Sequence, residues 1–530
     1  MKKLITIIVA AGALATSCSD FLTEIPKDEI APSQFFKNSD HAYNAVNALY
    51  RSGLPSLFSG GVYSGSRIML GPYTSGLIDN EYKGQEVHVQ YAQQLTMNPV
   101  NMSTYLGGIW RDLYLGISRA NNAIKYVPTT PGLAEAEANK LQAEARFFRA
   151  LNYYYLVRYF GGVPLITEPY ESLENLYVER AAVGDVYALV VEDLQYAVQP
   201  GILPNTTMDG NGNRITHGIA KSLLAEVYLT MSGYPLQANH YADAAQQARS
   251  LINDGVFSLT QHDRDGAGNV IPAASAYNKA RLADHLPNEH IYYFEYTTGI
   301  ATSGYAQWAF PTNISPELEY AIANNAYAPT DELLAAYSPT DDLRGQEKQY
   351  FHSSFTRANG TVVNFQDAPY LWYDEQAAFE TASSEKDLPI YTYANVLLIA
   401  AESIALSEGV TDEAIDYLSQ VRARAYWKQS VEQVKASLSD LTPQQFVAEV
   451  WKERLRELIF EFHVWFDIQR TRQFPVTDNG EINFVDVVGH RNTFDATYTQ
   501  KHLLYPIPDD EIQRNPALDP NPGYTEQNGG

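Results

Sequence analysis

The chain contains 530 residues, and 45% of them are hydrophobic, which is enough to bury a large core. Its 62 acidic residues outnumber its 37 basic residues and give a net charge of −25, which repels phosphate backbones and argues against nucleic-acid binding. Cys18 is the only cysteine, so the sequence excludes an internal disulfide, a multi-cysteine zinc site and a CxxC redox pair.

The N-terminus has the features of a lipoprotein signal peptide. Lys2 and Lys3 precede an apolar run, residues 4–14, which is too short to span a bilayer and has the length of a signal-peptide core. Small residues lead into Cys18, as in a lipobox, although Ala15 stands where leucine is usual. We expect cleavage after residue 17 and acylation of Cys18, palmitate included, because several acyl chains anchor a protein stably. The alternative is an ordinary cysteine near a simple cleavage site.

The first strong helical pattern covers residues 141–160, where large apolar residues recur at steps of three and four. Gly161 and Gly162 predict the end of this helix, and Pro164 prevents it from continuing.

Two later segments each predict a pair of helices. Residues 217–255 give a helix rich in small residues, a Gly/Pro turn and a second helix that begins near His240. Residues 391–425 repeat this order, with Gly409 at the turn and Thr411 as the expected N-cap of the second helix. Because alanines let helices approach closely, we interpret both segments as tetratricopeptide-like pairs.

Between these pairs, residues 255–390 are rich in Gly, Pro, Asn and aromatic residues and show little helical periodicity. We expect loops and short strands there, a pattern typical of a binding region carried by a helical scaffold. The predicted organisation is therefore a signal peptide (1–17), a lipidated tether (18–40), an N-terminal helical region (41–254), a ligand-binding insert (255–390) and a C-terminal helical region (391–530).

Several segments, in order along nearly the whole chain, together match the pattern of one known family. These segments are CSDFLTEIP (18–26), IWRDLYLGISRANNAI (109–124), EARFFRALNYYYLVRYFGGVPLI (144–166), LPIYTYANVLLIAAESI (388–404), ERLRELIFEFHVWFDIQRT (453–471) and LLYPIPDDEIQRNPALDPNPGY (503–524). They resemble the SusD/RagB family of surface lipoproteins. Two departures stand out, since Thr392 replaces a usual arginine and Asp519-Pro520 replaces a usual glutamine region.

This resemblance implies a mostly α-helical fold in which tetratricopeptide-like pairs pack against a loop-rich region with short strands. It implies a protein anchored in the outer membrane and facing the cell exterior, which captures oligosaccharides and delivers them to a SusC-like TonB-dependent transporter that it covers as a hinged lid. The family implies no catalysis and no cofactor. The alternative cargo is a peptide, as for RagB-like members, and the acidic charge would then favour basic peptides.

A second alternative is a surface glycoside hydrolase, which needs only two carboxylates roughly 5–9 Å apart. The sequence contains no HExxH, GxSxG or P-loop motif. The most suggestive acids lie at steps of four on one expected helix with arginines nearby, so ion pairing explains them better than catalysis. These acids are Glu453, Glu457 and Glu461, and the arginines are Arg454, Arg456 and Arg470.

Two polar stretches resemble parts of calcium loops. Residues 209–213 copy the first half of an EF-hand loop, but Arg214 and Ala220 occupy the places of the required glycine and glutamate. Residues 263–269 form another polar turn. We interpret both as ordinary loops and expect no metal site.

Two aromatic, Gly-rich stretches offer the chemistry of a sugar site, in which ring faces cover C–H groups and polar side chains bond hydroxyls. They are residues 71–85 and 296–311. The alternative for the second stretch is that Trp308 and Phe310 pack inward. The predicted ligand contacts are Tyr73, Asp79, Asn80, Tyr82, Tyr305 and Trp308, whereas the residues expected in the core are Trp110, Trp451, Trp465 and Phe466.

Overall fold

A computed structural model of the chain describes residues 35–58, 65–170, 172, 176–357, 359–478 and 481–524. The expected signal peptide and Cys18 lie outside the described residues. Within these ranges, no helix combines the length and the apolar character that crossing a membrane requires.

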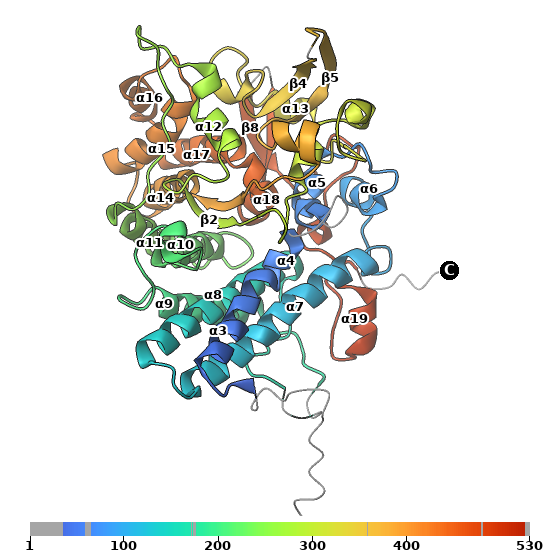
Figure 1. Cartoon of the computed structure of the whole chain (residues 1–530), viewed down its shortest axis with the longest axis vertical. Coiled ribbons are helices and arrows are strands. Elements are labelled where there is room, and N and C mark those ends of the chain that lie inside the picture. The colour runs from blue at the N-terminus through green and yellow to red at the C-terminus, as the bar shows by residue number, and fades with distance from the viewer. Residues whose placement is uncertain are drawn as a thin grey trace, which may run out of the picture.

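The described chain is mostly helical, with a few short strands, as predicted (Figure 1). The helices are α3 (Ser39–Asn47), α4 (Leu54–Phe58), α5 (Leu70–Ser75), α6 (Val87–Gln93), α7 (Ser103–Tyr126), α8 (Glu135–Phe160), α9 (Val183–Ala197), α10 (His217–Ser232), α11 (Tyr241–Asn253), α12 (Ala276–Leu282), α13 (Asp331–Leu334), α14 (Tyr393–Ser407), α15 (Asp412–Ala425), α16 (Val431–Leu438), α17 (Pro443–Glu457), α18 (Val464–Thr471) and α19 (Asp509–Arg514). The strands are β1 (Ile78–Asp79), β2 (His290–Phe294), β3 (Ala328–Pro329), β4 (Phe351–Thr356), β5 (Val362–Pro369), β6 (Leu388–Thr392), β7 (Gln473–Asp478) and β8 (Glu481–Asp486).

The long helices stack in sequence as neighbouring pairs. Helix α8 packs against α7 and α9, α10 packs against α11, and α14 packs against α11, α15 and α17. Figure 1 shows α10, α11, α14, α15 and α17 rising as one column above α7, α8 and α9. The stack therefore continues from α11 to α14, although residues 254–392 separate these two helices in the sequence.

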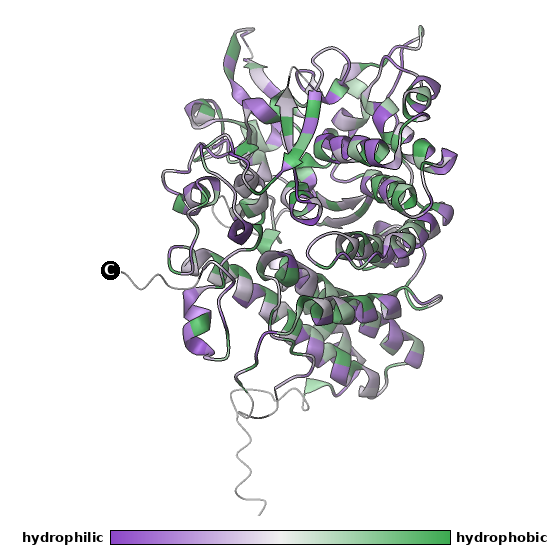
Figure 2. Cartoon of the chain, turned by 180° about the vertical axis from the view of Figure 1, so that it is seen from behind, coloured by the Kyte–Doolittle hydropathy of each residue, from purple (hydrophilic) through white to green (hydrophobic). Residues whose placement is uncertain are grey.

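Helices at the centre of this stack are buried on all sides. Every residue of α8 from Phe147 to Phe160 is buried, and so is every residue of α14 from Tyr393 to Ala405. Such all-round burial explains why these segments lack a strong polar face. The peripheral helices instead alternate hydrophobic and hydrophilic residues around their circumference (Figure 2).

The predicted helix ends are confirmed. Helix α8 ends at Phe160, and Gly161 follows with a φ of 72°, where an added Cβ would lie only 2.9 Å from Leu504 Cδ1. Thr411 caps α15, since its side chain accepts a hydrogen bond from the Ala414 backbone N–H at 3.2 Å. Thr392, at one departure from the family pattern, caps α14 in the same way.

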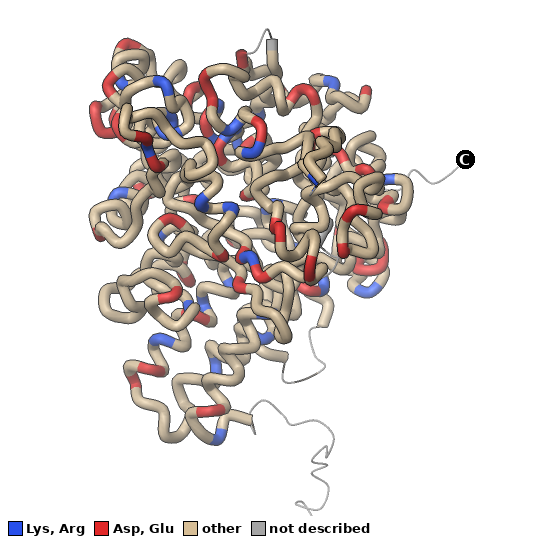
Figure 3. Tube along the Cα trace, turned by 45° about the horizontal axis from the view of Figure 1, so that its top comes forward, with Lys and Arg blue, Asp and Glu red and all other residues tan. Residues whose placement is uncertain are grey.

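The strands form four separate two-stranded antiparallel ribbons within the described residues. Ribbon β2–β6 pairs a strand inside the insert with the strand that leads out of it into α14, since His290 lies opposite Thr392. Ribbon β1–β3 joins Asp79 to Ala328, and it brings the first predicted ligand loop against the insert. Acidic and basic residues are interspersed along the trace, as Figure 3 shows.

Candidate functional site

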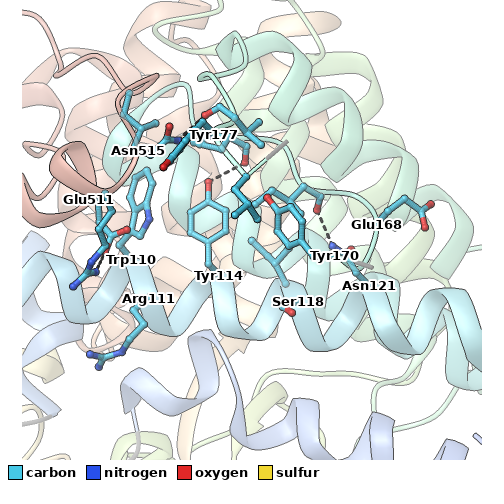
Figure 4. Close-up of a pocket in the computed structure, with 17 residues that line it drawn as sticks. Trp110, Arg111, Tyr114, Ser118, Asn121, Glu168, Tyr170, Tyr177, Glu511 and Asn515 are labelled. Carbon is cyan, nitrogen blue, oxygen red and sulfur yellow. Dashed lines mark hydrogen bonds and ion pairs between the residues drawn. The ribbon is translucent and has the colours of Figure 1, made fainter. Parts of the chain in front are cut away.

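A cavity with a volume of about 580 Å³ opens between helix α7, the chain that follows α8, and helix α19 (Figure 4). We call it the aromatic pocket. Its described lining residues are Trp110, Arg111, Tyr114, Ile117, Ser118, Asn121, Pro164, Ile166, Glu168, Tyr170, Leu176, Tyr177, Val178, Glu511, Arg514, Asn515 and Leu518.

One face of α7 forms the floor of the aromatic pocket. Its lining residues are spaced by three and four, which places them on the same side of a helix. Trp110 is only 5% exposed and meets Phe160 edge to face at 5.1 Å, so its predicted place in the core is confirmed. Its remaining exposed surface nevertheless lines the pocket.

Side chains tie the opposite wall to this floor. The Tyr114 hydroxyl donates a hydrogen bond to the Pro164 carbonyl at 2.8 Å, and Asn121 Nδ2 donates to the Ile166 carbonyl at 2.8 Å. On the third side, Asn515 Nδ2 donates to the Val178 carbonyl at 2.9 Å. Three segments that are distant in the sequence are thus held together by hydrogen bonds, and the pocket is preformed in this structure.

The rim of the aromatic pocket carries exposed aromatic and aliphatic side chains. Tyr170, Leu176 and Tyr177 are 50%, 46% and 64% exposed. Because large apolar side chains usually cluster on a protein surface only where something binds, this cluster indicates a binding surface. Figure 4 shows Tyr170 and Tyr177 on the wall facing α7. Flat, accessible rings above an apolar floor suit a ligand with apolar faces and a polar edge.

Charges of both signs surround the aromatic pocket. Arg514 Nη1 pairs with Glu511 Oε1 at 2.6 Å, and Glu168 lies 3.8 Å from Lys125 Nζ. Arg111 lies 3.3 Å from the carboxylate of Asp112. Because each of these charged side chains lies beside one of opposite charge, the rim favours an uncharged ligand over an ion.

The first predicted ligand loop is largely occupied by its own hydrogen bonds. Tyr73 is fully buried, and its hydroxyl donates to the Ala326 carbonyl at 2.6 Å and accepts from Asn80 Nδ2 at 3.1 Å. Asn80 is also fully buried and donates to Glu86 Oε2 at 2.6 Å. Burial raises the pKa of Glu86 to about 7, against the opposing effect of the Asn80 hydrogen bond. Tyr73 and Asn80 therefore hold the loop in place.

Asp79 and Tyr82 are the more accessible members of this loop. Asp79 pairs with Lys83 Nζ at 2.7 Å and accepts a hydrogen bond from Gln93 Nε2 at 2.9 Å. Tyr82 is half-buried, and its backbone N–H donates to Asn80 Oδ1. Their contact with ligand stays a prediction.

The second predicted loop packs inward, as the alternative for Trp308 and Phe310 predicts. Residues 305–309 form a turn of 3-10 helix, so Tyr305 and Trp308 project to the same side. They are 4% and 1% exposed, meet edge to face at 4.7 Å, and both contact Trp372. Phe310 is also buried. Ligand contact by Tyr305 or Trp308 stays a prediction that requires the covering side chains to move.

The first predicted loop contacts the residue that directly follows the second predicted loop. The Thr312 backbone N–H donates a hydrogen bond to Glu81 Oε2 at 2.8 Å, in addition to the β1–β3 pairing. Neither loop contributes a lining residue to the aromatic pocket. The sequence analysis did not identify Tyr170 and Tyr177 as site residues. The only signal for them in the sequence is the presence of two tyrosines in the acidic stretch that follows Pro164.

The three glutamates expected on one helix are separated by a helix end, because α17 stops at Glu457 and Glu461 lies in a following 3-10 turn. Ion pairing is confirmed for the first two. Of the expected arginines, Arg456 lies 4.0 Å from Glu453, but the shorter pairs involve other arginines. Arg344 Nη2 lies 2.8 Å from Glu453 Oε1, and Arg344 Nη1 lies 2.6 Å from Glu457 Oε2.

The electrostatic environments of these glutamates differ. Although burial opposes ionisation, Arg344 and Arg422 lower the pKa of Glu453 to about 2. Burial instead raises the pKa of Glu461, whose carboxyl group accepts a hydrogen bond from the Thr392 hydroxyl at 3.0 Å. The arginines clamp Glu453 and Glu457 in structural pairs, which makes them unsuitable as mobile catalytic groups.

Among the described residues, no three His, Cys, Asp or Glu side chains are grouped so that they could hold a metal ion. In the stretch that resembles an EF-hand, Asn211 Oδ1 accepts from Lys140 Nζ and Asn213 Nδ2 donates to Glu295. These amide side chains point to different partners and do not converge on one point.

Two family models match the chain. One, described as the SusD family, matches residues 369–524, and the other, described as starch-binding associating with outer membrane, matches residues 65–229. SusD-like protein P2 of Formosa agariphila is 28% identical over 546 residues, which cover 99% of this chain and 100% of that protein. A SusD-like protein of Bacteroides ovatus is 30% identical over 257 residues, covering 48% of this chain and 44% of that protein.

Solved structures share the fold. A SusD superfamily protein from Parabacteroides distasonis has a TM-score of 0.79 at 28% identity, covering 94% of this chain and 100% of that one. A laminarin-binding SusD-like protein has a TM-score of 0.69 at 21% identity, covering 92% of this chain and 100% of that one. The two family models match segments in both halves of the molecule, and the solved structures share its fold. The chain belongs to the SusD/RagB family.

Proposed function

We propose that this protein is a non-catalytic surface lipoprotein that binds oligosaccharides and delivers them to a SusC-like TonB-dependent transporter in the outer membrane. The family description, starch-binding and associated with the outer membrane, supports the location and the class of ligand. Two structural neighbours are described as a laminarin-binding protein and as surface glycan-binding protein A from Bacteroides uniformis. The tether to the membrane would be the acylated Cys18.

The observation that carries this proposal is the aromatic pocket. Sugars present C–H faces that stack on rings and hydroxyls that need polar partners, and the rim supplies Tyr170 and Tyr177 beside Ser118 and Glu168. Its volume of about 580 Å³ lies within the range of about 300–1,000 Å³ that is usual for small-molecule sites. The neutralised rim suits an uncharged glycan.

The same pocket argues for a glycan over a peptide. A peptide is held chiefly through hydrogen bonds between backbones. In the aromatic pocket, the carbonyls of Pro164, Ile166 and Val178 already accept hydrogen bonds from side chains of the protein. Ring faces and polar side chains, rather than these backbone carbonyls, remain available to a ligand.

The loops at 71–85 and 296–311 offer a second place for the ligand within the same function. Tyr82 and Asp79 are accessible there, whereas Tyr305 and Trp308 are covered. Binding at these loops would need a rearrangement of the side chains around Trp372. The aromatic pocket needs none, so we place the glycan there first.

Calorimetric titration of the full-length protein in non-ionic detergent tests the proposal. The probes are laminarin and maltose oligosaccharides, and the variant is Tyr170→Ala/Tyr177→Ala. We expect binding of at least one probe by the wild type and a loss of at least tenfold in the variant, with little change in stability because both rings are exposed. Phe379→Ala, an exposed ring outside the pocket, is the matched control and should bind normally.

Unchanged affinity in the double variant would remove the aromatic pocket from consideration. Incubation of the bound oligosaccharide with the protein, followed by analysis of the products, distinguishes binding from hydrolysis. Cleavage at a rate above that of the buffer would contradict a non-catalytic function.

A further inference from the structure

A second cavity of about 170 Å³ lies among the end of α8, the loop after α10, helix α18 and residues 500–504. We call it the basic pocket. Four of its described lining residues are basic and none is acidic, in a chain whose acids outnumber its bases by 62 to 37. These basic residues are Arg158, Arg470, Arg472 and Lys501.

Two of these cations already have carboxylate partners behind the pocket. Arg158 Nη1 lies 3.2 Å from Glu226 Oε1, and its guanidinium stacks 3.7 Å from the ring of Phe466. Arg470 pairs with Glu402 at 2.5 Å and with Asp467 at 2.7 Å. Both arginines are buried, and their positions are therefore fixed.

The other two cations have no such partner. Within the described residues, no carboxylate oxygen lies within 4.0 Å of Arg472 or Lys501. Each lies near an aromatic ring, since Arg472 Cζ lies 5.1 Å from the centre of the Tyr234 ring and Lys501 Nζ lies 5.5 Å from that of the Tyr524 ring. Both side chains are half-buried, and burial lowers the pKa of Arg472. An anion in the pocket would compensate two partly desolvated positive charges.

The backbone keeps Arg472 at the mouth of the basic pocket. Arg472 has a φ of 61°, a left-handed conformation that is uncommon for a residue with a side chain and that ends α18. The loop after α10 docks beside it, because the Tyr234 N–H donates to the Arg470 carbonyl at 2.8 Å. Gly233 permits this approach, since an added Cβ would lie 2.5 Å from the same carbonyl oxygen.

The remaining surface of the basic pocket combines apolar and aromatic residues, including Val157, Val183, Leu504 and Tyr187, with uncharged polar ones. These polar residues are Thr230, Gln469, Gln500 and Asn521. The volume of about 170 Å³ is smaller than the roughly 300–1,000 Å³ of sites for larger ligands, so a single ring-sized group fits. An arginine fork matches the two oxygens of a carboxylate, and a lysine adds a point charge. Tyr234 is 41% exposed and offers a ring face at the entrance.

We propose that the basic pocket binds a carboxylate-bearing sugar ring, that is, a uronic acid unit, through Arg472 and Lys501. This site is separate from the aromatic pocket and does not depend on the proposed binding of neutral glycans there. Because the net charge of the whole chain repels anions, recognition here relies on contacts inside the pocket, where screening by salt is weaker than at the surface.

The test titrates the full-length protein with sodium glucuronate, with glucose and with sodium sulfate, at ionic strengths matched with sodium chloride. We expect binding of glucuronate, no measurable binding of glucose or sulfate at the same concentrations, and at least tenfold weaker glucuronate binding in Arg472→Met/Lys501→Met. The control is Arg491→Met/Lys279→Met, which also removes one arginine and one lysine. These two residues pair with Asp495 and Asp263 outside the pocket.

Equal binding of glucose, binding of sulfate without glucuronate, or full affinity in the Arg472→Met/Lys501→Met variant would each overturn the proposal. A second readout does not depend on folding of the variant. Glucuronate should protect Arg472 of the wild type at least threefold against modification by phenylglyoxal, measured by peptide mass spectrometry. Modification at an unchanged rate would also overturn the proposal.

Discussion

Arg344 connects the insert to the helical scaffold through a buried network of charges. It is 0% exposed, and its guanidinium contacts Asp342, Glu453 and Glu457. The two glutamates have other partners, since Arg422 pairs with Glu453 and Arg424 pairs with Glu457. Asp342 has no other cation within 4.0 Å among the described residues and is itself fully buried.

Arg344→Met should therefore leave one buried carboxylate without a counter-charge. Removing one partner of a buried pair costs about 3–5 kcal/mol. Asp342 would keep the backbone N–H of residue 344 as a donor, at 2.9 Å in the wild type, but would lose contacts of 2.9 and 2.8 Å to the guanidinium. Adding Asp342→Asn removes the unpaired charge, so the double variant should be more stable than additivity predicts by about 1–3 kcal/mol.

Urea unfolding, followed by tryptophan fluorescence and by circular dichroism, measures this free energy. Arg249→Met is the matched control, because Arg249 makes comparable pairs with Glu408 and Glu413 at 2.6 Å on the surface and should cost only about 0–1 kcal/mol. A loss below about 1 kcal/mol in Arg344→Met, or no recovery on adding Asp342→Asn, would show that the Asp342 carboxylate does not depend on Arg344 as its counter-charge.

Three further predictions concern stability and anchoring. Because burial raises the pKa of Glu86 from 4.5 to about 7, the folded chain holds a proton that the unfolded chain releases, so wild-type stability should fall as the pH rises from 4.5 to 7. Glu86→Gln should remove this loss and be more stable than wild type by on the order of 3 kcal/mol at pH 8. Urea unfolding at pH 4 and pH 8 measures both free energies, and the same pH dependence of stability in the two proteins would contradict the raised pKa. Trp308→Ala should destabilise the fold by about 3–5 kcal/mol, since the ring is 1% exposed, and a change below about 1 kcal/mol would contradict its place in the core. Cys18→Ser should abolish incorporation of labelled palmitate and release the protein from the membrane fraction, whereas retained label would place the lipid elsewhere.

The helical scaffold could be predicted from the sequence because its signals are local. Gly161 and Thr411 end and begin helices through their own backbone and side-chain chemistry, and α8 and α14 show apolar residues in the expected pattern. The break after Glu457 was missed, since the charged pattern continues to Glu461 while the chain leaves the helix.

The candidate site could not be predicted in the same way. Trp110, Tyr170 and Asn515 belong to three segments that meet only in the folded chain, and each segment by itself indicates a helix face or a loop. An aromatic-rich stretch also does not reveal whether its rings face solvent. Trp308 illustrates this, because the spacing that suggested a platform turns the ring onto Trp372 in the core.

A crystal structure of the protein with the oligosaccharide that binds most tightly would show whether the aromatic pocket is the glycan site. We expect sugar rings in the aromatic pocket, stacked on Tyr170 or Tyr177, with the loops at 71–85 and 296–311 unchanged. A sugar bound instead between Tyr82 and an uncovered Trp308, with the aromatic pocket empty, would contradict this expectation.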